Sequence, residues 1–562
     1  MAHLEAASAP NIEDLVEVHE THISWVFLAG DRAYKLKKPL VLPFLDYGTP
    51  QRRRELCSEE VRLNRRLAAD IYVGVCALVP TPAGLELAEE GDARAVDYMV
   101  EMRRYDERDT MSATLDRGEL TDAQVVEVAS RLAAFHAACP RAPGREHGPD
   151  GAESEVDRNV EELLGVARSR GERQRIRTLA RFMTAFLASR SAMLDERQAR
   201  GCVRECHGDL RAEHVVLGPQ VNVVDCVEFD VELRTLDVAD DLAFLVMDLA
   251  ARGGELAGAQ LIDGYRQAGG DCGNDALLAF FAVHRALVRA KVWLLRADQH
   301  PPNSAPHGHA SAEARDLIAL AERFAWRARL PLVIVVCGAP ASGKSYLAQA
   351  LGAAAGLPPL SADVVRKGLA GIAPTEPASP EHYSADFSRA TYTELGCRAR
   401  AEVDSRGGSL VDATFRRRAD RDAFCDGFAD AAPLLFIECL VPKEILARRA
   451  AVRERDPERI SDATLEVALR ERERWEPLDE VPARSHLALR TDRAVEAILT
   501  DVIALLDERL DAARVLSAIA APPRGARATA GRIRRAPHPG PGDITDVPED
   551  RESDDPSLSA DP

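Results

Sequence analysis

The first part of the chain alternates between short apolar segments and turns, which predicts a strand-rich region. Residues 25–29 and 32–37 are rich in apolar side chains and flank Gly30 and Asp31, a pair that favours a tight turn, so we expect a β-hairpin. Two further strands are expected over 73–79 and 96–102.

A helix is expected between these strands, over 53–69. Leu56, Leu63 and Leu67 recur in this segment at helical spacing and share one face. The helix would therefore bury its leucine face against the predicted strands.

From Thr121 onward the pattern becomes helical. Thr121 to Gln124 resembles a capping box and precedes an amphipathic run. More helices are expected over about 155–197 and again up to about 328. Between them, short strands over 215–217 and 221–224 enclose a loop rich in Asp and His.

The pattern changes again at Pro331. Residues 332–337 form a nearly continuous apolar run of β type, as expected for a strand buried on both faces of a parallel sheet. Helices then alternate with strands at about 408–412 and 434–440, which is α/β periodicity.

These patterns predict two folded domains of different class, and a length of 562 residues agrees with more than one domain. The first is an α+β domain in which a strand-rich part precedes a helical part, the second an α/β domain with a parallel sheet. After about 518 the chain is rich in Pro, Gly and Ala and almost lacks large apolar residues, which predicts disorder. The expected ranges are 1–328, with lobes at about 10–103 and 104–328, then 329–515, and a disordered tail over 516–562.

The composition of the chain argues against several classes of function. Hydrophobic residues make up 46% of the chain and charged residues 29%, as in ordinary globular proteins. No apolar run is long enough to enter a membrane, and the acidic start lacks the pattern of a signal peptide, which favours the cytoplasm. A formal net charge of -19 argues against a nucleic-acid partner, although local cations and helix N-termini still permit nucleotide phosphates. Nothing in the sequence predicts an oligomeric state.

The 11 cysteines are expected to be thiols. One group, Cys202, Cys206 and His207 with Cys226 beyond, raises the alternative of a zinc site. The paired spacing of zinc ligands is missing there, so we favour buried thiols beside a functional loop.

The strongest motif lies after the apolar run at 332–337, where eight residues fit G-x-x-x-x-G-K-[ST]. In this motif glycines let backbone N–H groups turn towards phosphate, the lysine places a cation near the β and γ oxygens, and the last hydroxyl reaches Mg²⁺. A helix expected over 346–355 would aim its N-terminus at the anion. The residues are Gly338, Ala339, Pro340, Ala341, Ser342, Gly343, Lys344 and Ser345.

Four later residues are candidates for the same site. Asp412 ends a predicted strand and suits Mg²⁺, or it merely caps a turn. Asp363 falls at a strand–helix junction, where it would accept the proton of a substrate hydroxyl or cap the helix. Arg449 and Arg453 share a helical face and would close over the phosphates, or form a solvated basic face. Over about 330–510 the chain resembles small P-loop kinases.

The first domain contains a second set of residues suited to phosphate binding and transfer. Asp209 and Asp225 lie in loops that close neighbouring strands and offer one carboxylate for an acceptor hydroxyl and one for Mg²⁺. Lys35 in the first hairpin offers a cation for the ATP phosphates. Glu60 projects about 40° from the apolar face of its helix and needs a cationic partner there, with Lys35 the natural choice and Glu59 the alternative carboxylate.

These residues resemble the aminoglycoside phosphotransferase family of the protein-kinase-like fold. His207-Gly208-Asp209-Leu210, followed by His214, is similar to the family's H-G-D-[LF]-x-x-x-N loop, and the resemblance spans about 10–325. It implies a catalytic role for Asp209, a metal role for Asp225 and a Lys–Glu pair. The whole chain resembles bacterial proteins described as bifunctional aminoglycoside phosphotransferase/ATP-binding proteins.

One departure from that family concerns the metal. His214 stands where the family has asparagine, and imidazole is a poor ligand for Mg²⁺. The alternatives are that one metal suffices, that Glu213 or Asp230 supplies an oxygen instead, or that the site is weak or inactive.

The sequence therefore favours an ATP- and Mg²⁺-dependent phosphotransferase with two nucleotide-binding modules and a small hydroxylated acceptor. The alternative is an ATP-binding regulatory protein whose kinase-like half binds a ligand or partner without catalysis. A weaker alternative, phosphorylation of polynucleotide ends by the P-loop half, is disfavoured by the acidic charge.

Overall fold

The computed structural model describes residues 17–520 except 22, 43–44, 83, 143–148 and 456–458. Most of the tail expected to be disordered, residues 521–562, lies outside the described residues. Residues 516–520 end the last helix, α16 (Val495–Ala520).

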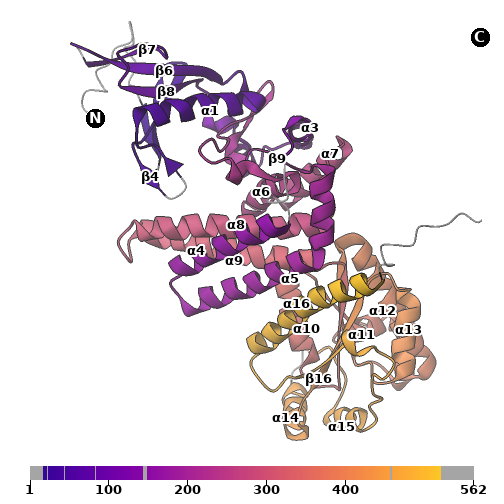
Figure 1. Cartoon of the computed structure of the whole chain (residues 1–562). Coiled ribbons are helices and arrows are strands. Elements are labelled where there is room, and N and C mark those ends of the chain that lie inside the picture. Colours follow the sequence, from indigo (N-terminus) through magenta and orange to yellow (C-terminus); the bar gives the residue numbers. More distant parts are fainter. Residues whose placement is uncertain are drawn as a thin grey trace, which may run out of the picture. The chain divides into compact units, whose positions relative to one another are not determined.

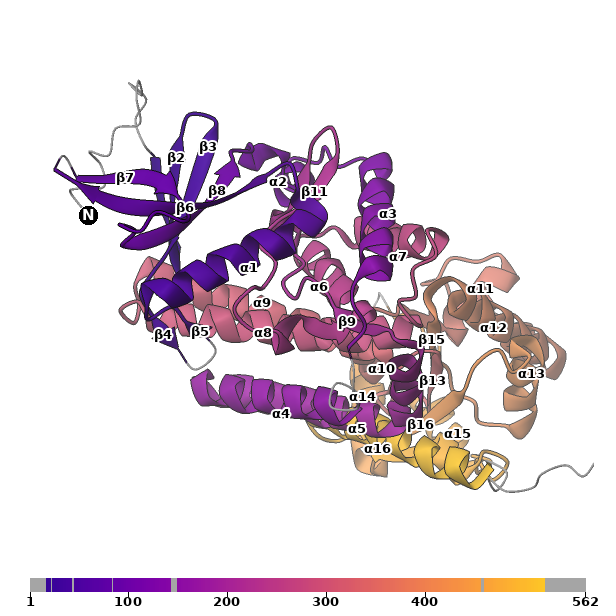
Figure 2. The same cartoon turned by 45° about the horizontal axis from the view of Figure 1, so that its top comes forward.

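The first lobe is built on a six-stranded antiparallel sheet in the order β1-β2-β3-β8-β6-β7, with α1 packed across it (Figures 1 and 2). The predicted hairpin is β2–β3, and Gly30 in its turn has a φ of 59°. The helix begins three residues earlier than predicted, because Thr49 accepts a hydrogen bond from the backbone N–H of Arg52 and Pro50 starts the first turn. The elements are β1 (Glu17–Glu20), β2 (Ser24–Ala29), β3 (Arg32–Lys37), β4 (Val41–Leu42), β5 (Leu45–Asp46), α1 (Pro50–Ala68), β6 (Tyr72–Thr81), β7 (Gly84–Glu89) and β8 (Asp97–Arg103).

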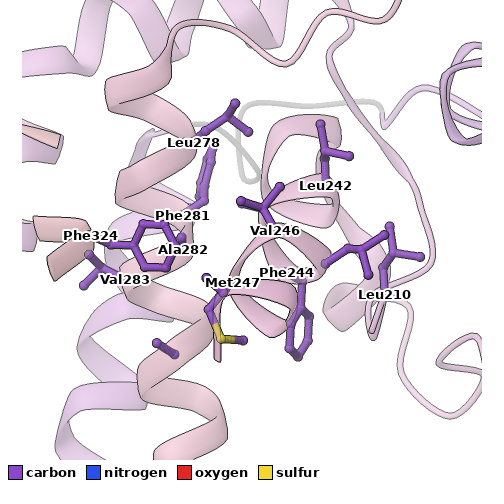
Figure 3. Packing of buried hydrophobic residues seen from close by; sticks show 14 of the residues in the cluster. Leu210, Leu242, Phe244, Val246, Met247, Leu278, Phe281, Ala282, Val283 and Phe324 are labelled. Carbon is purple, nitrogen blue, oxygen red and sulfur yellow. The ribbon is translucent and has the colours of Figure 1, made fainter. Parts of the chain in front are cut away.

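The second lobe is mainly helical, with two small antiparallel pairs, β9–β12 and β10–β11. Its core lies between α6 and the surrounding helices, where Phe281 and Leu242 are buried (Figure 3). The elements are α2 (Met111–Asp116), α3 (Asp122–Ala138), α4 (Pro149–Val166), α5 (Arg170–Arg200), β9 (Val203–Glu205), β10 (Val215–Leu217), β11 (Val221–Val223), β12 (Thr235–Asp237), α6 (Val238–Ala251), α7 (Glu255–Gln267), α8 (Asp275–Asp298) and α9 (Ala305–Ala328). The predicted capping box at Thr121 is present at the start of α3.

The remaining part is an α/β unit whose five-stranded parallel sheet has the order β14-β15-β13-β16-β17. Alternate residues of β13 enter two different cores: Val335 packs on one side of the sheet and Val336 on the other. The central strand is thus buried on both faces, as predicted from its apolar run. The elements are β13 (Leu332–Cys337), α10 (Lys344–Ala355), β14 (Pro359–Ser361), α11 (Ala362–Ala370), α12 (Ala385–Arg406), β15 (Gly408–Asp412), α13 (Arg418–Phe428), β16 (Leu434–Leu440), α14 (Lys443–Arg453), α15 (Leu465–Glu473), β17 (His486–Arg490) and α16.

The two fold classes predicted from the sequence, a bilobal α+β domain and a parallel α/β domain, are both confirmed. Among the described residues, none of the helices combines the length and apolar character that a membrane span requires.

Candidate functional site

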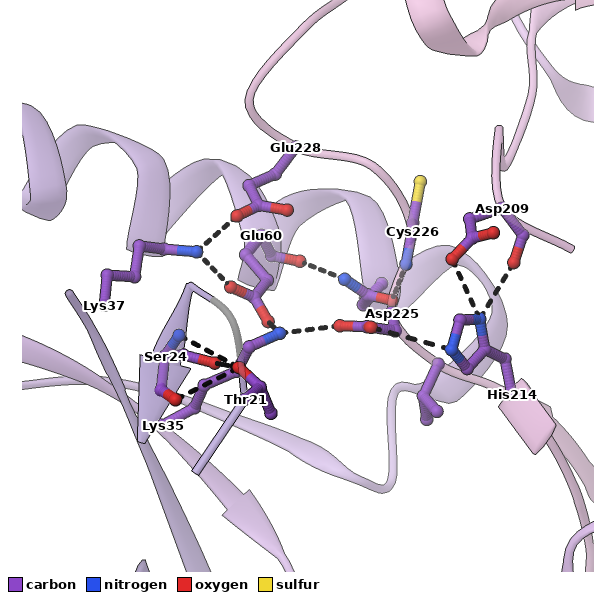
Figure 4. A network of polar contacts seen from close by, with 12 residues as sticks. Thr21, Ser24, Lys35, Lys37, Glu60, Asp209, His214, Asp225, Cys226 and Glu228 are labelled. Carbon is purple, nitrogen blue, oxygen red and sulfur yellow. Dashed lines mark hydrogen bonds and ion pairs between the residues drawn. The ribbon is translucent and has the colours of Figure 1, made fainter. Parts of the chain in front are cut away.

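Lys35 lies at the centre of the first site. It projects from β3, and its Nζ is 2.9 Å from Oε1 of Glu60 on α1 and 2.6 Å from Oδ1 of Asp225 (Figure 4). Burial alone would lower the pKa of Lys35, but the charges of Asp225 and Glu60 outweigh it and raise the pKa well above its ordinary value. The lysine is therefore a fixed cation between two carboxylates, and Glu60 rather than Glu59 is its partner.

A second lysine, Lys37, completes this network and was not among the sequence candidates. Its side chain is 1% exposed, and its Nζ donates to Oε2 of Glu60 at 2.6 Å and also to Oε1 of Glu228. Tyr47 donates its hydroxyl to the same oxygen of Glu228. The sequence did hold a signal, because residues two apart on a strand share a face, which places Lys37 beside Lys35.

The network joins the two lobes. Glu228 follows Asp225 in the second lobe, whereas Lys37 and Glu60 belong to the first (Figure 4). One oxygen of Glu60 faces each lysine, so the carboxylate cannot turn without breaking a charge-assisted hydrogen bond. Lys37 therefore fixes the orientation in which Glu60 meets Lys35.

Asp225 follows the short strand β11. Its φ of 66° is unusual for a residue with a side chain and marks a sharp turn. Although burial opposes ionisation, the charge of Lys35 holds the pKa of Asp225 well below its ordinary value. Its side chain is 47% exposed, so an ionised carboxylate is available to a ligand at this edge.

The loop that carries Asp209 is held by buried groups. The carboxylate of Asp241, on α6, accepts the backbone N–H groups of His207 at 3.0 Å and Gly208 at 2.9 Å. His207 in turn donates from Nε2 to the carbonyl oxygen of Val224 at 3.0 Å. These contacts tie the Asp209 loop to the strand end that presents Asp225.

Asp209 itself is paired with Arg211. The guanidinium donates from Nε to one carboxylate oxygen and from a terminal nitrogen to the other, both at 2.9 Å. Burial raises the pKa of Asp209, but the charge of Arg211 reverses the effect and leaves the pKa below its ordinary value. Asp209 is thus an ionised carboxylate with one lone pair per oxygen already used.

The contacts of His214 define its tautomer. Its Nδ1 is 2.8 Å from the carbonyl oxygen of Asp209, which can only accept, so Nδ1 carries the proton. Nε2 then offers a lone pair, and Arg211 donates to it at 3.0 Å. Nε2 is also 3.7 Å from Oδ2 of Asp225. In this arrangement the lone pair that a metal would need is occupied by Arg211.

Neither of the replacement oxygens weighed for the metal is free. Glu213 accepts a hydrogen bond from Arg211, and Asp230 accepts the backbone N–H of Glu232 at 2.8 Å. Asp225 is therefore the carboxylate of this site that fits Mg²⁺ best, since it pairs with Lys35 through Oδ1 and its half-exposed side chain keeps Oδ2 as a hard oxygen ligand.

The second site is the loop from Gly338 to Ser345, between β13 and α10. Gly338, Ala341 and Gly343 have φ values of 144°, 65° and 96°, which turn the backbone into a concave loop. A Cβ on Gly338 would lie 2.8 Å from the carbonyl oxygen of Cys439, so only glycine fits there. The loop leads directly into α10, whose first residue is Lys344, two residues before the predicted start.

Asp412 stands beside this loop at the end of β15. It is 8% exposed, and its Oδ1 has no hydrogen-bond partner among the described residues. Burial raises the pKa of Asp412, while Lys344 and Ser345 act in the opposite direction. An unsatisfied buried oxygen next to a serine hydroxyl fits a divalent cation, which is a better account than a turn cap.

Asp363 and the two predicted lid arginines lie around the same end of the sheet. Asp363 is in the first turn of α11, but Ser361 holds the cap position. Arg449 donates to the carbonyl oxygens of Ser342 at 3.2 Å and Thr491 at 2.7 Å, so it braces the P-loop from its carbonyl side.

Arg453 donates to the carbonyl oxygen of Ala463 at 2.9 Å, and its Nε is buried without a partner among the described residues. Burial lowers the pKa of Arg453, and the charge of Asp363 opposes this shift. Neither arginine belongs to a solvated basic face.

Near the first site, the structure brings together a set of possible metal ligands that differs from the set considered in the sequence. The group of possible metal ligands within the described residues is His136, Cys206 and Asp241. Asp241 is already bound to His136 at 3.1 Å as well as to the loop amides. Cys202, Cys206 and Cys226 are buried thiols, as expected.

Comparison with known proteins identifies both parts. Residues 28–281 match the family model described as the Phosphotransferase enzyme family, and residues 333–478 match one described as an AAA domain. Uncharacterized proteins of Mycobacterium tuberculosis and Mycobacterium bovis are each 32% identical over 466 residues, which is 81% of this chain and 89% of the relative.

Solved structures show partial likeness. A gluconokinase from Sinorhizobium meliloti is 23% identical, with a TM-score of 0.24, and covers 34% of this chain and 99% of its own. A choline/ethanolamine kinase family protein from Mesorhizobium loti is 14% identical, with a TM-score of 0.34, and covers 57% of this chain and 97% of its own. Neither likeness assigns a substrate.

Proposed function

We propose that this chain, which belongs to the family of two-domain proteins joining a phosphotransferase domain to a P-loop AAA domain, is an ATP-dependent kinase that phosphorylates a hydroxyl group of a small molecule. The observation that carries this proposal is the convergence of Lys35, Glu60 and Asp225 from three separate segments. A largely buried cation held between carboxylates suits triphosphate binding.

In the first site, Lys35 would grip the ATP phosphates and Asp225 would hold Mg²⁺. The metal, when bound, supplies positive charge to the phosphate oxygens. Asp209 would orient the acceptor hydroxyl and take its proton. Its pairing with Arg211 leaves a second lone pair on each carboxylate oxygen for that contact.

In the second site, the loop from Gly338 to Ser345 would hold the phosphates of ATP through backbone N–H groups, with Lys344 as the cation. Ser345 and Asp412 would hold Mg²⁺, which fits the unpaired buried oxygen of Asp412. Asp363 would accept the proton of the acceptor hydroxyl, and Arg453 beside it would contact the transferred phosphoryl group.

The second candidate function is that the first half regulates and does not catalyse. The contacts of Arg211 favour it. This arginine occupies one lone pair on each oxygen of Asp209 and the lone pair of His214. Under this alternative the first half would bind nucleotide or a partner, and the P-loop half alone would transfer phosphate.

A phosphate-transfer screen with a library of hydroxylated metabolites and aminoglycosides tests the proposal. Asp209→Asn should abolish transfer by the first half with ATP affinity nearly intact, and Lys344→Ala should abolish nucleotide binding by the second. If Asp209→Asn loses no activity on any acceptor while Lys344→Ala loses all of it, the regulatory alternative holds instead.

A further inference from the structure

The second lobe contains a cavity separate from both phosphate sites. Its volume is about 850 Å³, and residues of α4, β9, β12, α6 and α8 line it. The described residues that line the cavity do not include Lys35, Asp209 or Asp225. The cavity is therefore distinct from the residues assigned to phosphate transfer.

His284 is a buried polar residue of the cavity wall. This residue of α8 is 3% exposed, and its Nε2 has no hydrogen-bond partner within the described part of the chain. Burial lowers the pKa of His284 to about 4, so the ring is neutral near pH 7. Buried polar atoms are almost always satisfied, so an unpaired ring nitrogen facing a cavity indicates a missing partner.

Glu155 of α4 faces the same nitrogen across the cavity. Its Oε1 lies 3.9 Å from Nε2 of His284, which is too long for a hydrogen bond. With the ring proton of His284 on Nδ1, Nε2 would accept, and a nitrogen placed about 2.8 Å from both atoms would then donate one hydrogen bond to each. The spacing therefore fits one donor group with at least two hydrogens.

Two further carboxylates of the cavity wall, Asp240 and Asp237, are already paired with arginines. Asp240 accepts a bidentate pair of hydrogen bonds from Arg285, at 2.7 and 2.5 Å, and Asp237 accepts two from Arg197, both at 2.7 Å.

Arg158 also lines the cavity, but it is exposed and forms no ion pair with Glu155 among those of the described residues. Among the described residues, Glu155 forms no ion pair closer than its 3.9 Å contact with His284. Burial raises the pKa of Glu155, but surrounding charges, those of Arg285, Arg158 and Lys291 among them, hold it below its ordinary value, so the carboxylate is ionised and open to a cationic ligand.

We propose that this cavity binds a small organic compound with a primary ammonium group, which bridges Glu155 and His284. An ammonium group carries a positive charge that pairs with the carboxylate of Glu155. It also has enough N–H groups to donate one hydrogen bond to Glu155 and one to His284. The cavity wall includes Phe281, whose apolar ring suits the carbon chain that carries the ammonium.

Calorimetric titration of the full chain with 1,6-diaminohexane tests this proposal, with two matched compounds as controls. 1,6-Hexanediol keeps the chain but lacks charge, and hexamethonium keeps the charge but lacks N–H donors. We expect the diamine to bind at least about tenfold more tightly than either control, since charge-assisted hydrogen bonds are the stronger kind.

Variants locate the site. Glu155→Gln and His284→Phe should each weaken diamine binding about tenfold or more, whereas Glu161→Gln, an exposed glutamate on the same helix, and Asp209→Asn should leave it unchanged. Glu155 is 33% exposed, so Glu155→Gln decides the matter even if His284→Phe does not fold. The proposal is overturned if the wild type does not bind the diamine, if hexamethonium binds equally well, or if Glu155→Gln binds as Glu161→Gln does.

Discussion

Replacing Lys37 by methionine tests the buried network that joins the two lobes. Lys37 is the cation between Glu60 and Glu228, whose side chains are 0% and 6% exposed. Methionine fills a similar volume but leaves Glu228 with only the hydroxyl of Tyr47. Removing one partner of a buried ion pair costs about 3–5 kcal/mol, because the remaining charge is left uncompensated.

That cost should appear as faster local opening. Every 1.4 kcal/mol is about a tenfold change, so amide hydrogens in α1 and β3 should exchange about a hundred- to a few-thousand-fold faster in Lys37→Met. Hydrogen–deuterium exchange of the full chain, followed by mass spectrometry, measures this directly.

Two variants serve as controls. Lys38→Met removes the neighbouring lysine, whose partner Glu20 is 60% exposed, and should cost less than about 1 kcal/mol. Adding Glu228→Met to Lys37→Met removes the stranded carboxylate and should restore most of the protection. If Lys37→Met exchanges no faster than Lys38→Met, the network does not stabilise the junction of the lobes.

Three further predictions concern the phosphate sites. Burial raises the pKa of Asp412, so the contribution of this carboxyl group to stability is present below its unfolded pKa and lost as pH rises. Asp412→Asn should therefore raise the melting temperature of the nucleotide-free protein at pH 7, yet weaken Mg²⁺-dependent ATP binding about tenfold or more. A lower melting temperature without nucleotide, or a larger stabilisation by Mg–ATP in thermal melts, would refute this. His214→Asn supplies an oxygen ligand and frees Arg211, so the Mg²⁺ concentration for half-maximal nucleotide binding by the first half should fall about threefold or more; an unchanged value would mean that this position does not contact the metal. Arg449→Met removes two hydrogen bonds to carbonyl oxygens behind the P-loop, so ATP affinity of the second half should drop about tenfold in calorimetry, while Arg448→Met, an exposed neighbour, should match the wild type.

The sequence predicted those parts of the sites that depend on local rules. The P-loop follows from glycine and lysine spacing, and the partnership of Glu60 with Lys35 follows from the position of Glu60 beside an apolar helix face. The parallel α/β class followed from hydrophobic periodicity, as the two faces of β13 illustrate, whereas the two-lobed arrangement was implied by the family resemblance.

What the sequence missed depends on contacts between distant segments. Lys37 acquires its role from Glu228, which is 191 positions away, and no local pattern pairs them. The tautomer of His214 depends on the backbone carbonyl of Asp209 and on Arg211, so only the folded loop reveals it. Arg449 shares a helix face with Arg453, yet the first contacts the carbonyl oxygen of Ser342 in the P-loop and the second contacts that of Ala463.

We propose that one chain holds two separate triphosphate sites. Calorimetric titration of the full chain with Mg–ATP measures it most directly, because the stoichiometry counts the sites. We predict two molecules of nucleotide per chain, one remaining after Lys344→Ala and the other after Lys35→Ala. A stoichiometry of one in the wild type, or loss of all binding from either single variant, would contradict the account.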